Sequence, residues 1–227
     1  IMLSVLGSTF GGGGDLSSLS LISGTHNPNN STAQVTAPSS NINAGDLLII
    51  QEYGPDVSSN INGNIPSGFT KIVDSEHAAV DHRVHYKIAA GNEASTTYYG
   101  QTGSNEDMSL FVFRGDKAIT SVTVDQTNST DNTNYPSTTL FSLNTTTSTL
   151  VFFGCGSRSS DNCYFSSQTP SGIWTNYNHL NTGNSNEVEA FSWYFNANGV
   201  SGSHSMQMTS SSASRQTILA AALTLGT

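Results

Sequence analysis

Charged residues are scarce in this chain. Only 10% of its 227 residues are Asp, Glu, Lys or Arg, against ~25% in an average soluble protein. Basic residues are the scarcest, with 7 Lys and Arg against 16 Asp and Glu, and the formal net charge is -9. This sign argues against a nucleic-acid partner, because phosphate backbones are bound by clustered Lys and Arg. No apolar run reaches the ~18 residues typical of a membrane-spanning helix, so we expect no membrane partner.

Cysteine is almost absent as well, with two residues, Cys155 and Cys163, on either side of the polar segment 156–162. Two interpretations stay open: two free thiols near a loop, or a local disulfide that closes the loop in an oxidising compartment. A metal site would need further Cys or His ligands close by. The local sequence holds none, so we expect no metal here.

Catalytic motifs are missing too. The chain has no G-x-S-x-G nucleophile elbow, no G-x-G-x-x-G and no P-loop. Nothing in the spacing of its few carboxylates marks two of them as the partners of a glycosidase pair. The sequence therefore predicts a protein that is not an enzyme and has no cofactor.

The densest group of titratable residues is the segment Asp74–His85, which holds three histidines and three carboxylates. On a strand, His82 and His85 point to opposite faces because side chains alternate with a period of two. They would therefore not converge on one ion. We predict a solvated hairpin end here and no metal site.

What the chain does have is an internal repeat. Four landmarks of the first half recur in the second half in the same order, at an offset that grows from about 103 to about 108 residues. Surface loops that gain a few residues produce such a drift. The chain is thus predicted to hold two copies of one strand pattern. The matched pairs are Gly45–Ile50 with Ser148–Phe153, Pro66–Thr70 with Pro170–Thr175, His85–Ala89 with Trp193–Ala197, and Ser109–Phe113 with Thr217–Ala221.

Strand-like runs alternate with turn clusters along the whole body of the chain. Leu47–Glu52 is a continuous apolar run, typical of a strand inside a packed layer, and Arg83–Ala89 alternates with a period of two. No amphipathic helix exceeds a turn or two. The other predicted strands are Leu19–Ile22, Ala33–Ala37, Phe69–Val73, Thr96–Tyr99, Met108–Arg114, Ser121–Val124, Thr138–Leu143, Thr149–Phe153, Trp174–Tyr177, Glu189–Asn196, His204–Thr209 and Gln216–Leu225.

Many short strands with regular turns predict an all-β protein, a jelly-roll-like antiparallel β-sandwich built from two duplicated halves. No Pro- or Gly-rich linker separates the halves at residues 115–119. We therefore expect one domain over residues 15–227, with halves of about 15–115 and 116–227, in preference to two separate domains.

Residues 1–14 differ from the rest, because an apolar stretch is followed by the glycines Gly11–Gly14. Four glycines in a row give a flexible tether. One interpretation is a frayed end or a first strand; the other is an arm that docks on a neighbouring subunit. Its docking side chains would be the apolar ones, Met2, Leu3, Val5, Leu6 and Phe10.

Aromatic residues suggest a second type of function. Sandwich lectins present aromatics and Asn or Asp in loops, and Tyr53, Tyr135, Tyr164 and Tyr177 are the candidates here for contact with a sugar. Trp174 lies in the repeated Pro-Ser-Gly turn, where a structural role is expected.

The order of turn and strand signatures resembles a known family. Gly45–Leu48, Pro66–Thr70, Tyr86–Gly91 and a strand ending at Phe113–Gly115 are similar to the duplicated jelly-roll-like β-sandwich proteins of bacteriophage virions. These proteins include tail, fibre and head-decoration components. The resemblance covers about residues 30–227.

The resemblance implies a virion structural protein that acts by assembly: a capsid decoration, head-fibre or tail-associated component. Its partners would be capsid or tail subunits and copies of itself. The alternative is a carbohydrate-binding adhesin or receptor-binding module on a phage fibre or a bacterial surface, located outside the cell. Deleting residues 1–14 should leave a folded body that no longer joins particles.

Overall fold

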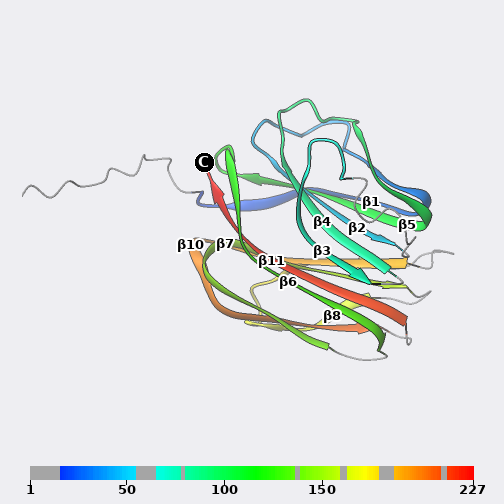
Figure 1. Ribbon diagram of the computed structural model, residues 1–227. Helices are drawn as coiled ribbons and strands as arrows, with labels where there is room; N and C mark the ends of the chain where they lie inside the picture. The colour runs from blue at the N-terminus through cyan, green and yellow to red at the C-terminus, as the bar shows by residue number, and fades with distance from the viewer. Residues whose placement is uncertain are drawn as a thin grey trace, which may run out of the picture.

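The computed structural model describes residues 16–54, 65–77, 80–135, 139–158, 163–178, 187–210 and 214–227. Every regular element in them is a β-strand, and all the strands pair antiparallel in two sheets that face each other (Figure 1). The chain is therefore an all-β sandwich, as the sequence predicts.

The first sheet, sheet A, is built from the first half of the chain. Its strands follow the order β1-β5-β2-β4-β3. They are β1 (Leu19–Thr36), β2 (Leu47–Gly54), β3 (Thr70–His77), β4 (Val80–Ile88) and β5 (Thr97–Gly115).

The second sheet, sheet B, is built from the second half, in the order β6-β11-β7-β10-β8, with β9 also paired to β10. The first, last, second, next-to-last and third strands of each half thus follow one another in the same order in both sheets. A duplicated template would produce this order, although the duplication itself stays a prediction. The strands are β6 (Ser121–Tyr135), β7 (Thr139–Arg158), β8 (Cys163–Thr169), β9 (Thr175–Asn178), β10 (Glu187–Ser210) and β11 (Ser214–Gly226).

Several pairs of predicted short strands are single long strands. Leu19–Ile22 and Ala33–Ala37 are both parts of the β1 region, and β10 joins Glu189–Asn196 to His204–Thr209. Register shifts interrupt the ladders between these parts. A β-bulge bends a strand without ending it, so a break in the alternation does not mark a loop here.

The central strand β2 is buried on both faces. Leu47 and Ile49 face sheet B and join the largest core cluster, whose members come from both halves of the chain, for example Phe152 and Phe191. Leu48 and Ile50 face the other way, into a second core made by sheet A alone. Sheet A curls over itself, which is why its far face is also covered (Figure 1).

Candidate functional site

Polar side chains replace apolar ones toward one end of the interface between the sheets. On the face of sheet A that looks at sheet B, Ile49 on β2 is followed by Gln51, and Phe111 on β5 is preceded by Ser109. Ser109 pairs with Gln51 on one side and with His26 of β1 on the other. Three polar residues therefore lie side by side on three neighbouring strands.

Glu189 of β10 in sheet B contacts these residues. Ser109 Oγ donates a hydrogen bond of 2.6 Å to Glu189 Oε2 and lies 3.1 Å from His26 Nδ1. Gln51 Nε2 donates to the carbonyl oxygens of Cys155 and Ala190, at 3.3 and 3.4 Å. We call His26, Ser109, Gln51 and Glu189 the inter-sheet polar row.

Burial shifts the pKa values of both titratable groups of the inter-sheet polar row toward their neutral forms. Burial, and then the neighbouring Asp107 and Glu52 charges, raise the pKa of Glu189 well above its usual value. Burial lowers the pKa of His26 to about 4. Both shifts favour the uncharged forms, and the row joins the two sheets through hydrogen bonds, because a buried charge costs far more than a buried neutral group.

The segment Asp74–His85 was predicted to be a solvated hairpin end, and this is wrong for its second strand. Asp81, His82, Arg83 and His85 are all buried. One face of β4 packs on sheet B, where His82 contacts Thr217, and the other lies toward the interior of sheet A, where His85 lies near Glu52, so both faces are covered. Solvent reaches the segment at the pair formed by Lys71 and Asp74 on β3.

The predicted alternation within β4 is confirmed. His82 faces sheet B, where its Nδ1 lies 2.8 Å from Thr217 Oγ1 of β11. His85 faces the interior of sheet A, where its Nε2 lies 3.8 Å from Glu52 Oε2. Burial lowers the pKa of His82 to about 3. Among the described residues, no three His, Cys, Asp or Glu side chains are grouped so that they could hold a metal ion.

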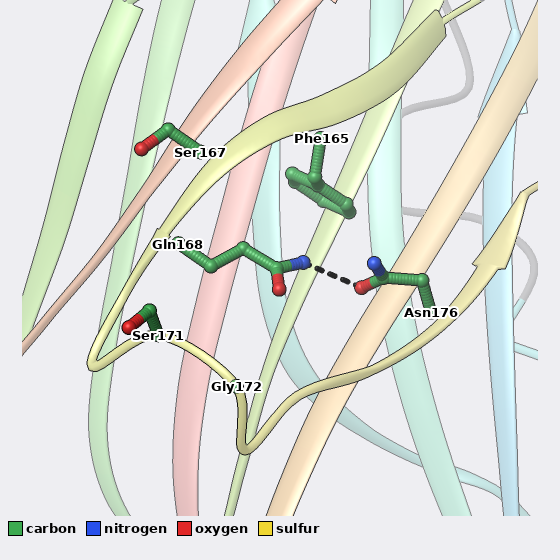
Figure 2. A pocket seen from close by; sticks show the side chains of 6 residues that line it. All are labelled: Phe165, Ser167, Gln168, Ser171, Gly172 and Asn176. Atoms are coloured by element: carbon green, nitrogen blue, oxygen red, sulfur yellow. Dashed lines mark hydrogen bonds between the residues drawn. The ribbon is translucent and has the colours of Figure 1, made fainter.

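A separate, solvent-open pocket lies between β8, β9 and the turn that joins them. It has a volume of about 180 Å³, and Figure 2 shows the side chains of Gln168 and Asn176 joined by a hydrogen bond beside the Phe165 ring. Among the described residues that line it, none is charged. The lining residues are Phe165, Ser167, Gln168, Ser171, Gly172 and Asn176.

Two of the four candidate sugar-contact tyrosines have described side chains, and both are packed between the sheets. Tyr53 is fully buried, with its ring edge-on to His82, so its prediction as a sugar contact is wrong. Tyr177 is half-buried against Phe111, and its hydroxyl donates to the carbonyl of Gly24 on β1 at 3.3 Å. An aromatic residue in a strand can belong to the core or contact a ligand, and the sequence alone does not distinguish the two.

The remaining candidate residues lie in parts of the chain that the structure does not describe. The side chains of Tyr135 and Tyr164 and the whole of residues 1–14, including Met2, Leu3, Val5, Leu6 and Phe10, lie outside the described residues. Cys155 is buried in an apolar cluster of sheet B, while the side chain of Cys163 is not described. Both cysteine alternatives therefore stay predictions.

Trp174 has the structural role expected of it. Its Nε1 donates a hydrogen bond of 2.9 Å to the carbonyl oxygen of Pro170, and its ring packs edge-on to Phe153. Sequence reasoning missed the pocket residues next to it. Gln168 and Asn176 flank the repeated Pro-Ser-Gly turn, and polar side chains on both sides of one turn are the signal that could have identified them.

Comparison with known proteins adds no relative. No protein-family model matches the chain, and no curated protein or solved structure gives a significant match. None of the described residues forms a helix of the length and hydropathy needed to cross a membrane. What is established is the fold: the chain is an antiparallel β-sandwich in which each half contributes one sheet.

Proposed function

We propose that this protein is a structural subunit that acts by assembly with other subunits, as the resemblance to virion proteins implies. The observation that carries this proposal is the edge of sheet B. The edge strand β6 is 15 residues long and pairs with β11 on one side. No described strand forms a ladder with its outer side.

The β6 edge lacks several of the features that usually protect an exposed strand, although its ladder with β11 has register shifts, one of them at Asp125. Soluble proteins shield their edges with short strands, Lys, Pro or bulges that turn the edge away. Residues 121–135 contain no Lys, Arg or Pro, and seven of the nine residues from Ser121 to Ser129 are exposed. Such an edge offers unpaired backbone donors and acceptors to a strand of another subunit.

The acidic residue in the exposed stretch does not shield it, because it is turned toward the protein. Asp125 Oδ2 accepts hydrogen bonds from Ser148 at 2.8 Å and from Thr224 at 2.6 Å. Ser75 of β3 donates a hydrogen bond of 3.4 Å to the carbonyl oxygen of Thr130, toward the far end of the strand. Short Ser, Thr and Asn side chains also lose little conformational entropy when they are packed.

Strand β1, one edge of sheet A, is also long and low in charge, although it contains Pro28 and several register shifts. Its 18 residues, Leu19–Thr36, include no Asp, Glu, Lys or Arg. Tyr177 of β9 contacts it at Gly24. Both sheets thus end in long strands of low charge, which supports assembly through sheet edges.

A lysine on the β6 edge should weaken assembly. In Thr127→Lys, we expect self-association, or incorporation into particles, to fall by about tenfold or more, because each added ammonium must be desolvated at the contact or face a like charge. Ser39→Lys, at an exposed loop position after the end of β1, adds the same charge outside β6 and serves as the control. Sedimentation velocity over a concentration series, with a thermal melt to verify folding, measures the effect.

The outcome that contradicts the proposal is equally clear. If the wild-type chain stays monomeric at every concentration and does not co-sediment with particles, it does not act by assembly. If it assembles but Thr127→Lys and Ser39→Lys behave alike, assembly does not use the β6 edge.

A further inference from the structure

The amide side chains that line the pocket between β8 and β9 are held in place by hydrogen bonds, one of them from a buried residue. Asn176 Oδ1 accepts hydrogen bonds from Gln168 Nε2 at 2.6 Å and from Ser192 Oγ at 2.5 Å. Ser192 belongs to β10 and is fully buried. Its hydroxyl also lies 3.3 Å from Gln168 Nε2. Both amides are therefore fixed by a residue that solvent cannot reach.

This arrangement determines which atoms a ligand would meet. The amide oxygen of Asn176 is already used twice, so its Nδ2 group remains as a donor, and the Oε1 atom of Gln168 remains as an acceptor. Among the described residues, no hydrogen bond uses either group. Figure 2 shows the two amides joined by a hydrogen bond, so a fixed donor and a fixed acceptor lie next to each other.

The rest of the lining favours a neutral ligand with an apolar face. The Phe165 ring, 8% exposed, offers its accessible edge to the pocket, and the hydroxyls of Ser167 and Ser171 lie at the rim. An ion is disfavoured because none of the lining residues that the structure describes is charged. The volume of about 180 Å³ lies below the ~300–1,000 Å³ of sites for drug-sized molecules, and so suits one small ring.

The turn at the rim of the pocket is also held in place by a hydrogen bond. Trp174 Nε1 donates to the carbonyl of Pro170, which closes the turn from 170 to 174. Gly172 occupies a left-handed conformation, with φ of 81°, in that turn. A site that is already formed loses little free energy to ordering when it binds.

We propose that this pocket is a binding site for a single neutral sugar residue. Neighbouring hydroxyl groups of a sugar each donate and accept, which matches the adjacent Asn176 donor and Gln168 acceptor, while a C–H face of the ring contacts Phe165. The site uses none of the tyrosines that the sequence suggested for a sugar. It is also independent of assembly at β6, which lies at the opposite edge of sheet B.

The test uses a panel of methyl glycosides of glucose, galactose, mannose and N-acetylglucosamine. Binding to the whole chain is followed by saturation-transfer NMR and titration calorimetry. We expect at least one glycoside to bind with millimolar affinity. Asn176→Ala and Gln168→Ala should each weaken that binding by about tenfold, because a ligand hydroxyl then loses its partner.

Two further variants separate local from general effects. Asn92→Ala removes an exposed amide far from the pocket and should leave binding unchanged. Ser171→Trp fills the rim and should abolish it, with amide spectra confirming that each variant is folded. Thr127→Lys should keep sugar binding whether or not it disrupts assembly.

The proposal is overturned if no glycoside of the panel binds the wild-type chain. It is equally overturned if a glycoside binds but retains its affinity in Asn176→Ala and Ser171→Trp.

Discussion

Replacing Gly156 by alanine should lower the free energy of unfolding by roughly 3 kcal/mol, at the upper end of the range for overpacking a core. Gly156 lies on β7 directly across the sheet interface from Tyr53. A β-carbon at this position would fall within 2.6 Å of three ring carbons of Tyr53. The ring is fully buried and edge-on to His82, so it has no free space to move into. Urea titration of the wild type and the variant measures the change.

A neighbouring glycine provides the matched control. A β-carbon on Gly154, two residues away on the same strand, would meet Gln51 Oε1 at 2.5 Å, the far end of a flexible side chain. The amide can shift, so Gly154→Ala should cost less than Gly156→Ala. Tyr53→Leu removes the ring edge, and the double variant Gly156→Ala with Tyr53→Leu should lose less stability than the two single changes added together. Equal costs for the two glycines, or simple additivity in the cycle, would show that the ring does not rest on Gly156.

Acid should destabilise the sandwich through His82, whose pKa burial lowers to about 3. An imidazole in the unfolded chain takes up a proton near pH 6.5, whereas the folded chain does not until about pH 3. Between these values the unfolded state binds more protons, so stability falls as the pH falls. The slope is about 1.4 kcal/mol per pH unit for each such histidine. His26, whose pKa is about 4, acts in the same direction down to that pH.

Glu189 acts in the opposite direction. Its pKa is raised in the folded state, so the folded chain keeps a proton that the unfolded chain releases above about pH 4.5. Its stabilising contribution is full below that pH and is lost as the pH rises through the folded pKa. Glu189 therefore offsets part of the histidine effect during acidification.

These opposite signs can be separated by two variants. His82→Gln should reduce the stability lost between pH 6.5 and about pH 4 by roughly 3 kcal/mol. Glu189→Gln should be more stable than the wild type at neutral pH, and this advantage should shrink toward pH 4.5. Urea titrations at a series of pH values give both profiles. Profiles parallel to that of the wild type would mean that neither side chain is buried in the state described here.

Local sequence patterns were sufficient for the strands and for which side chains share a face. The apolar run at Leu47–Glu52 is the central strand β2, and the spacing of His82 and His85 correctly placed them on opposite faces of β4. The strand and the alternation of its side chains depend on the geometry of a few consecutive residues. They can therefore be predicted without knowing which elements pack against them. The ends of β1 and β10 could not be read in this way, because bulges carry each strand across a break in its pattern.

The burial of the polar groups is determined by contacts between distant parts of the chain. A local pattern cannot show that sheet A curls over the second face of β4, or that Glu189 reaches Ser109 from 80 residues away. The pocket likewise needs Gln168, Asn176 and the buried Ser192 from three different strands. Alternation along a strand assigns a side chain to a face, but the elements that pack on that face determine whether it meets water, a core or a ligand.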